Sequence, residues 1–179
     1  MRKFKKLPNI DRRAYKGTFT PSNPSKYKGN VKNVVYRSSW EKRFMNYCDR
    51  TREIIEWGSE ELSIFYRGVD GKPHRYYPDF YMKVRQPNNT YKKFIVEIKP
   101  KYQTRKPKPG KIKSAYFKRS LLTYETNRRK WSTAFAFCKK HNMTFKILGA
   151  FAMIVNKHKD DVLVKPLANK NVKKNQKTS

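Results

Sequence analysis

Two segments of this chain are rich in β-branched and aromatic residues, and a short run of turn-forming residues separates them. The two segments span residues 74–84 and 91–99, and residues 86–90 between them are Gln-Pro-Asn-Asn-Thr. β-branched and aromatic side chains favour strands, whereas proline and asparagine favour turns. The sequence therefore predicts an antiparallel β-hairpin, around which the rest of the fold has to be built.

Three ionisable residues of this hairpin, Asp79, Glu97 and Lys99, are placed where they can meet. Successive side chains of a strand point to opposite faces, so Glu97 and Lys99 share one face. If Asp79 lies beside Glu97, their charges at about 4 Å repel by roughly 1 kcal/mol in water and about 4 kcal/mol near a protein surface. A divalent cation would reverse this cost, and such oxygen ligands suit Mg²⁺ or Mn²⁺. Alternatively, Glu97 and Lys99 form an exposed ion pair on an edge strand, which contributes little.

An apolar stripe at helical spacing precedes the hairpin, and Glu41 lies beside it. The stripe consists of Trp40, Phe44, Tyr47 and Cys48. This spacing predicts a helix with one face on the core. Glu41 has two interpretations. It is either an acidic residue that faces the sheet or the third position of a capping box that Ser38 begins.

The segments Tyr77-Pro78-Asp79-Phe80 and Val96-Glu97-Ile98-Lys99, with Trp40-Glu41-Lys42-Arg43-Phe44 upstream, resemble the PD-(D/E)XK nuclease superfamily. The resemblance extends over residues 35–150, and is to the branch that phage head completion nucleases share with the end-cleaving subunits of some transposases. It implies that Asp79 and Glu97 bind Mg²⁺ or Mn²⁺, that Lys99 assists the attacking water, and that Glu41 completes the metal site. It also implies an α/β fold with a restriction-endonuclease-like core, in which helices flank a central mixed β-sheet.

The charge of the chain identifies its partner class. The sequence has 44 Lys and Arg against 13 Asp and Glu, a formal net charge of +31. Such an excess is typical of proteins that bind nucleic acid, and we expect double-stranded DNA. A proline- and lysine-rich segment, residues 101–113, follows the hairpin as a flexible loop beside the site. Its expected DNA-binding residues are Lys101, Arg105, Lys106, Lys108, Lys111 and Lys113.

The sequence predicts one folded domain with a basic extension at each end. Residues 1–30 and 158–179 lack helical or strand periodicity and are expected to be basic extended arms, while residues 31–157 form the nuclease-like domain. Within that domain, residues 114–141 should form a long helix and residues 143–148 a strand, with a further packing segment at 150–156. The expected core stripe of the long helix is Trp131, Ala134, Phe135 and Cys138. Tyr76 and Tyr77 are expected to pack within the sheet, and Cys48 and Cys138 to be buried free thiols.

Two functional hypotheses remain. The resemblance implies a metal-dependent endonuclease that processes DNA ends in phage head completion after genome packaging, and that docks on portal or neck proteins. The alternative is a non-catalytic basic plug that keeps the fold and grips DNA at the head-neck junction. No signal peptide or membrane span is visible, so we expect the protein in the host cytoplasm and at the head-neck region of the virion. Three scattered histidines argue against a histidine-metal nuclease. The oligomeric state does not follow from the sequence.

Overall fold

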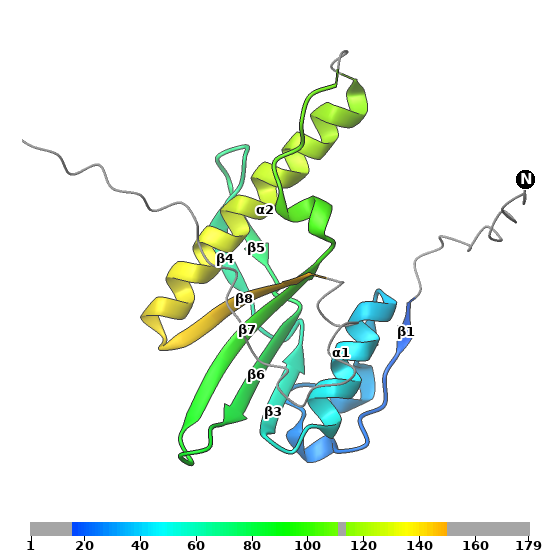
Figure 1. The fold of residues 1–179 in the computed structure, drawn as a ribbon, viewed down its shortest axis with the longest axis vertical. Helices are drawn as coiled ribbons and strands as arrows, with labels where there is room; N and C mark the ends of the chain where they lie inside the picture. Colours follow the sequence, from blue (N-terminus) through cyan, green and yellow to red (C-terminus); the bar gives the residue numbers. More distant parts are fainter. Residues whose placement is uncertain (1–15, 111–113, 150–179) are drawn as a thin grey trace, which may run out of the picture.

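The central sheet contains the predicted hairpin as its two middle strands. A computed structural model describes residues 16–110 and 114–149, and its elements form an α/β fold (Figure 1). The strands of the central sheet lie in the order β3, β6, β7, β8, with β6 antiparallel to β3 and β7, and β8 parallel to β7. The expected mixed sheet is confirmed. The elements are β1 (Gly17–Thr18), η1 (Pro24–Lys26), η2 (Val31–Asn33), β2 (Val35–Tyr36), α1 (Ser39–Arg50), β3 (Ile54–Ser59), β4 (Ile64–Arg67), β5 (Pro73–Tyr76), β6 (Phe80–Arg85), β7 (Tyr91–Lys99), η3 (Lys101–Thr104), α2 (Ala115–Lys140) and β8 (Met143–Gly149).

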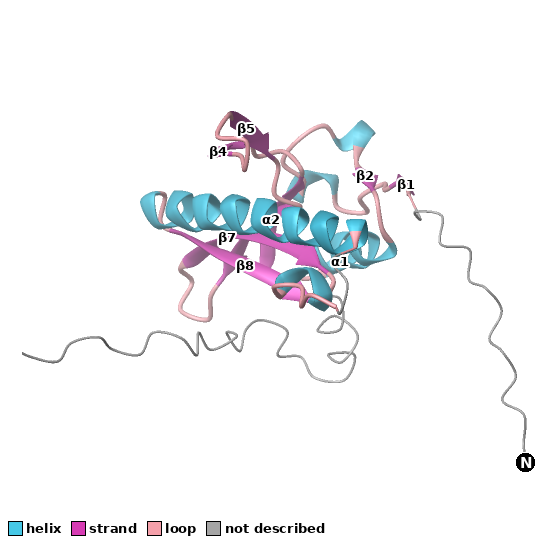
Figure 2. Ribbon diagram, turned by 90° about the horizontal axis from the view of Figure 1, so that it is seen from above, coloured by secondary structure: helices cyan, strands magenta, loops and turns pink. Residues whose placement is uncertain are grey.

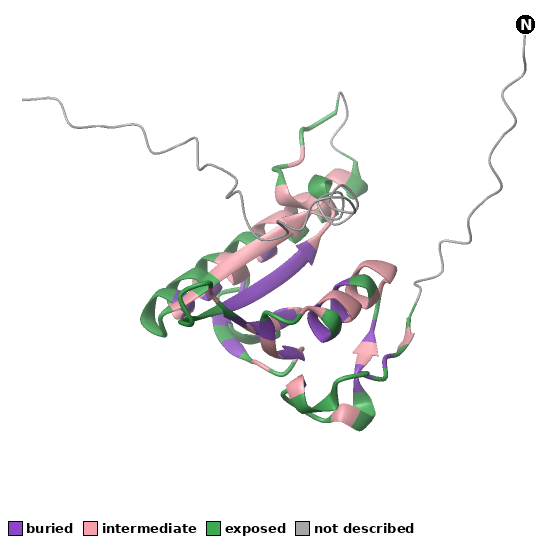
Figure 3. Cartoon of the chain, turned by 60° about the horizontal axis from the view of Figure 1, so that its bottom comes forward, coloured by how far each residue is buried: buried purple, intermediate pink, exposed green. Residues whose placement is uncertain are grey.

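The two long helices pack on opposite faces of this sheet. Phe44 and Cys48 of α1 belong to the same buried cluster as Val96 of β7. The neighbouring residue of β7, Ile95, points the other way and joins a second cluster with Ala134 of α2. Figure 2 shows α2 running along β7 and β8, and Figure 3 shows the buried middle of the sheet and the exposed outer side of α2. The alternation of β7 therefore divides the core into two layers.

The segment 74–84, which the sequence predicted as one strand, forms two strands of different sheets. β5 ends at Tyr76 and pairs with β4, whereas β6 begins at Phe80 and pairs with β3 and β7. Pro78 lies at the break, where its missing N–H cannot contribute to a strand ladder. The β4–β5 hairpin then packs on α2 through the buried side chains of Ile64 and Tyr66. The prediction of a continuous strand was wrong, and the break sets the position of Asp79.

Residues 16–30, which the sequence assigned to a basic arm, lie on the core instead. Phe19 and Tyr27 are buried around the ring of Trp57. The carboxylate of Asp49, buried at the end of α1, accepts the backbone N–H groups of Ser22 at 2.8 Å and Asn23 at 3.1 Å. This segment is anchored by single aromatic residues and by hydrogen bonds to a distant carboxylate, so it has no periodicity to detect. Residues 1–15 lie outside the described part of the chain.

The long helix α2 matches the prediction in extent but not in every core position. Ser114 caps its first turn, and Asn142, at φ 52°, lies in the left-handed conformation that commonly ends a helix. Ala134 and Cys138 are buried, but Phe135 is 64% exposed. Phe135 lies about 100° around the helix from Ala134, so it points away from the sheet, and its assignment to the core was wrong. Both cysteines are buried free thiols, as predicted.

Strand β8 covers the predicted segment 143–148. The packing segment expected at 150–156 and the tail 158–179 lie outside the described residues. Among the helices that the structure describes, none combines the length and the apolar character that crossing a membrane requires.

Candidate active site

Asp79 occupies the junction between the two sheets, directly before β6. Phe80 is the register partner of Val96, so the preceding residue, Asp79, comes level with Glu97 on β7. The Asp79 Oδ2 atom accepts the backbone N–H of Ile98 at 2.7 Å. This bond holds the carboxylate against β7 after Pro78 has interrupted the strand. Asp79 therefore lies in the interruption between β5 and β6, and its side chain reaches across to the neighbouring strand β7.

Lys99 lies between the two carboxylates. Its Nζ atom is 2.8 Å from Glu97 Oε1 and 3.7 Å from Asp79 Oδ2. The side chain of Glu97 is only 3% exposed, that of Asp79 16% and that of Lys99 23%. β7 is an inner strand of the sheet. The alternative interpretation of Glu97 and Lys99 as an exposed pair on an edge strand was therefore wrong, and the three residues converge at one place.

The electrostatics of this cluster show a shortage of positive charge. Burial, followed by the nearby carboxylate of Glu97, raises the pKa of Asp79 to about 7. Lys99 and the N–H of Ile98 oppose this shift without cancelling it. Burial lowers the pKa of Lys99, but the carboxylates of Asp79 and Glu97 outweigh burial and raise it overall. Lys99 is therefore an ammonium at neutral pH, and one ammonium does not neutralise both acids.

Tyr76, the last residue of β5, fixes the second oxygen of Glu97. Its hydroxyl donates to Glu97 Oε2 at 2.5 Å, and burial raises its pKa, so it remains a donor at neutral pH. The Lys130 Nζ atom, on α2, lies 5.6 Å from the centre of the Tyr76 ring. The orientation of Glu97 thus depends on two elements outside the central sheet: β5, which carries Tyr76, and α2, whose Lys130 contacts the Tyr76 ring. Sequence reasoning missed this role of Tyr76, because the contact joins residues 21 positions apart and depends on the pairing of β5 with β4.

A cavity of about 380 Å³ opens over these side chains. Tyr77 lines it and is 46% exposed, so the expectation that this ring packs within the sheet was wrong. Arg37 and Glu60 form part of the rim and make a two-bond ion pair, at 2.8 and 3.1 Å. The residues that line the cavity are Arg37, Glu41, Glu60, Arg75, Tyr76, Tyr77, Asp79, Glu97, Lys99 and Lys130. Arg37, Glu60, Arg75 and Lys130 come from four separate parts of the chain, and no local sequence signal connects them to the site.

Glu41 lines the same cavity while it also caps α1. Its Oε1 atom accepts the hydroxyl of Ser38 at 3.0 Å, and its Oε2 atom accepts the backbone N–H of Arg37 at 2.6 Å. Ser38 Oγ in turn accepts the N–H of Glu41 at 3.2 Å. The capping interaction is therefore present, although Glu41 reaches the N–H of Arg37 rather than that of Ser38. Both carboxylate oxygens of Glu41 are engaged in it.

The donors present fit a hard divalent cation. Mg²⁺ typically takes one or two carboxylates and completes its coordination with waters and substrate phosphate oxygens. Asp79 and Glu97 supply two carboxylates beside an open cavity, and the raised pKa of Asp79 marks a place where added positive charge is favourable. Across residues 16–110 and 114–149, no three His, Cys, Asp or Glu side chains are gathered closely enough to hold a metal ion.

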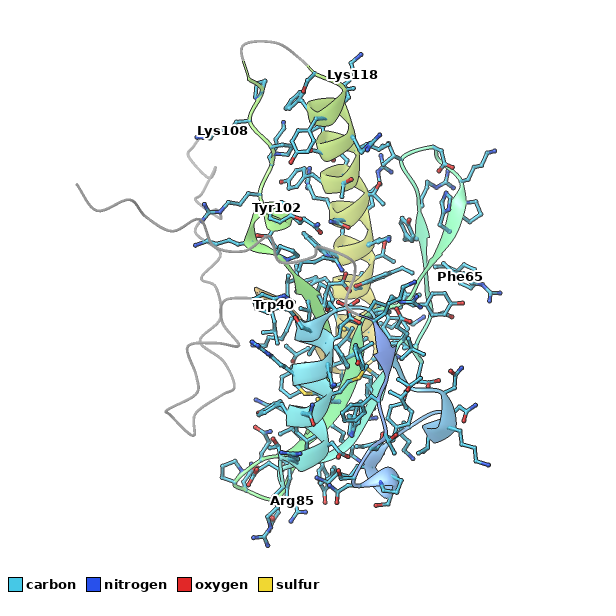
Figure 4. The ribbon with its side chains drawn as sticks, turned by 90° about the vertical axis from the view of Figure 1, so that its right-hand side faces the viewer. Trp40, Phe65, Arg85, Tyr102, Lys108 and Lys118 are labelled. Atoms are coloured by element: carbon cyan, nitrogen blue, oxygen red, sulfur yellow. The ribbon has the colours of Figure 1, made fainter. Side chains whose placement is uncertain are left out.

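The basic residues expected to bind DNA begin directly beyond the site. Lys101 opens the short helix η3, two residues after Lys99. Arg105, Lys106 and Lys108 follow on an exposed segment, which runs beside the first turns of α2 (Figure 4). Figure 4 shows Lys108 and Lys118 at this end of the molecule and Arg85 at the opposite end. The remaining expected residues, Lys111 and Lys113, lie outside the described part of the chain.

Comparison with known proteins points to one enzyme class. Residues 51–149 match the family model described as TnsA-like endonuclease N terminal. The chain is also 39% identical, over 140 residues, to the head completion nuclease of Enterobacteria phage T4, and the alignment covers 75% of this chain and 91% of that protein. No solved structure matches the chain.

Proposed function

The chain belongs to the TnsA-like endonuclease family, and from this premise we propose that it is a metal-dependent nuclease that cuts double-stranded DNA in phage head completion. One observation carries the proposal: Asp79 and Glu97 converge on Lys99 beneath an open cavity. In this proposal the protein works in the host cytoplasm and at the head-neck region of the virion, and processes DNA ends after packaging. Contact with portal or neck proteins belongs to the same proposal.

Each residue of the site has a separate task. Asp79 and Glu97 would hold Mg²⁺ or Mn²⁺, which when bound polarises a phosphodiester and lowers the pKa of a water molecule. Lys99, already protonated, cannot accept a proton from that water. It orients the water and neutralises the charge that develops on the phosphate. Tyr76 holds the Glu97 carboxylate in one orientation while these events occur.

The positive charge around the site supports DNA as the substrate. Residues 41–100, which contain the carboxylates, have 12 Lys and Arg against 9 Asp and Glu, whereas residues 101–179 have 21 against 3. A nearly neutral site within a basic chain attracts phosphates without repelling the cation. Lys101, Arg105, Lys106 and Lys108 are exposed on the segment that follows the site and are our proposed DNA contacts, together with Lys111 and Lys113 farther along the chain.

Removal of the metal tests this function directly. Incubated with linear and circular duplex DNA, the protein is expected to cleave both in the presence of Mg²⁺ or Mn²⁺ and to stop when a chelator is added. Without the cation, two carboxylates and one ammonium do not activate the attacking water. Binding in chelator should persist and weaken steeply as salt increases. Tight binding without cleavage in any divalent metal would favour a non-catalytic DNA plug over a nuclease.

Glu41 lines the cavity without forming a close three-carboxylate group with Asp79 and Glu97, and it is proposed as a further residue of the metal site in addition to its capping role. Glu41→Gln removes the charge but keeps an oxygen that can accept one of the two capping bonds. We therefore expect cleavage to fall by about 10- to 100-fold, with a loss of unfolding free energy below about 1 kcal/mol. Cleavage rates and urea unfolding curves measure the two effects.

Ser38→Ala is the matched control for this variant, since it removes the cap hydroxyl and leaves the Glu41 carboxylate in place. It should destabilise the protein by about 1 kcal/mol and retain cleavage. If Glu41→Gln cleaves at the wild-type rate, Glu41 is a cap alone.

A further inference from the structure

The β4–β5 hairpin has one face on the protein and one face open to solvent. Ile64, Tyr66 and Tyr76 are buried, because they point toward α2 and the central sheet. Phe65, between Ile64 and Tyr66, is exposed as expected from the alternation of a strand, and Arg75, directly before Tyr76, is exposed as well. Phe65 is 63% exposed, and Figure 4 shows it pointing away from α2. The hairpin therefore presents an exposed apolar ring to water.

Phe65 and Arg75 form a cross-strand pair. They are register partners in the β4–β5 ladder, and the guanidinium carbon of Arg75 lies 5.3 Å from the centre of the Phe65 ring. This contact covers part of the ring and holds the guanidinium close to it. The neighbouring residue on the same face, Arg67, adds a second exposed guanidinium. The acid at the hairpin turn, Asp70, is already paired with His74 at 3.0 Å.

The same surface continues into the candidate active site. Arg75 and Tyr77 both line the cavity that contains Asp79. Tyr77 is 46% exposed, so a second aromatic ring stands between the hairpin and the carboxylates. We call Phe65, Arg67, Arg75 and Tyr77 the hairpin surface. It combines two aromatic rings with two guanidinium groups, and Arg75 and Tyr77 bring it to the cavity where a phosphodiester would be cut.

We propose that the hairpin surface binds a DNA segment with unpaired bases next to the cleavage position, such as a frayed end or a branch. Aromatic side chains stack on bases whose faces are free, whereas the bases of an intact duplex already stack on one another. The two guanidinium groups would contact the phosphates of the same strand. This inference rests on the proposed nuclease function and specifies the class of DNA that the site takes.

The test compares two DNAs of equal length in chelator, where binding is separated from cutting. One is a fully paired duplex and the other has splayed, unpaired arms at one end. The wild-type protein should bind the splayed DNA more tightly. Phe65→Ala should weaken binding to the splayed DNA by about 5- to 100-fold, the range of one base stacking on an aromatic ring, and change binding to the paired duplex by less than about twofold.

Two further variants separate stacking from charge. Phe65→Trp keeps an aromatic surface and should retain the preference for splayed DNA. Arg75→Gln should reduce the slope of log affinity against log salt by about 0.7, the value for one phosphate contact on a single strand. Melting temperatures close to that of the wild type would show that these exposed positions leave the fold intact.

Tyr91 supplies a matched control at the far end of the sheet. It is 53% exposed, and the Lys83 Nζ atom lies 4.8 Å from its ring centre, so it is also an exposed ring beside a cation. Its register partner is Arg85, which Figure 4 shows far from Phe65. Tyr91→Ala should bind both DNAs as the wild type does.

The inference is overturned if Phe65→Ala binds splayed DNA as tightly as the wild type, or loses the same factor on both DNAs. Failure of the proposed nuclease function is seen separately, as an absence of Mg²⁺-dependent cutting by the wild-type protein. That result would leave the binding comparison in chelator valid.

Discussion

Glu97→Gln is expected to reduce Mg²⁺-dependent cleavage of duplex DNA by about 10³-fold, equivalent to roughly 4 kcal/mol of activation free energy. Glutamine has the shape of glutamate, and its oxygen can still accept the hydroxyl of Tyr76. The charge that would hold the cation beside Asp79 is lost, however, and the ion pair with Lys99 is lost with it. Initial cleavage rates measure the effect, while the affinity for DNA in chelator should change little.

Glu56→Gln is the control that matches this substitution most closely. Glu56 on β3 also accepts a tyrosine hydroxyl, that of Tyr81 at 3.0 Å, and is also near a lysine, Lys28 at 3.7 Å. It does not line the cavity of the candidate site. Glu56→Gln should therefore cleave like the wild type. Wild-type cleavage by Glu97→Gln, or an equal loss in both variants, would remove Glu97 from the proposed metal site.

Asp79→Asn is expected to make the metal-free protein more stable at pH 8 than the wild type. The pKa of Asp79 is about 7 in the folded protein, primarily because of burial and secondarily because of Glu97, against about 3.9 in an unfolded chain. The folded state therefore binds more protons between these values, so this residue's contribution to stability falls as pH rises from about 4 to about 7. The full difference is at most about 4 kcal/mol, and asparagine avoids it while its oxygen can still accept the N–H of Ile98.

Urea unfolding in chelator at pH 5 and pH 8 measures this effect. The stability of Asp79→Asn relative to the wild type should increase between the two values. Asp70→Asn provides a control without this pH dependence. The hydrogen bond from His74 lowers the pKa of the exposed Asp70, so its carboxylate is ionised at both pH values. A constant difference between Asp79→Asn and the wild type across this range would show that no carboxylate penalty exists. The expected gain in stability, combined with lost cleavage, is typical of a site that sacrifices stability for function.

Much of the fold could be predicted because its signals are local. The β6–β7 hairpin follows from two strand-forming segments and the turn between them, and the turn residue Asn89 adopts the left-handed conformation at φ 58°. Helix α1 follows from its apolar stripe and from the cap at Ser38. For the same reason Glu97 and Lys99 could be placed on one face, since alternation along a strand needs no information from the rest of the chain.

The errors arose where distant segments compete for the same residues. Tyr76 does not continue the strand that contains Phe80, because β5 pairs with β4 instead. Residues 16–30 were assigned to an arm because the residue that anchors them, Asp49, lies more than twenty residues away in the sequence. Phe135 satisfies the helical spacing, but the sheet beneath α2 does not reach around to it. Periodicity identifies which side chains share a face but not how wide the partner surface is.

The sequence by itself determined the ingredients of the site: two carboxylates and a lysine on neighbouring strands, within a chain of net charge +31. The tertiary structure decided that Glu97 is buried rather than exposed at an edge, that Tyr76 orients it, and that Arg37, Arg75 and Lys130 line the same cavity. The physical reason is that alternation and charge are properties of adjacent residues. Burial and a raised pKa depend on which distant elements exclude water from a group, and this is settled only when the sheets and helices pack together.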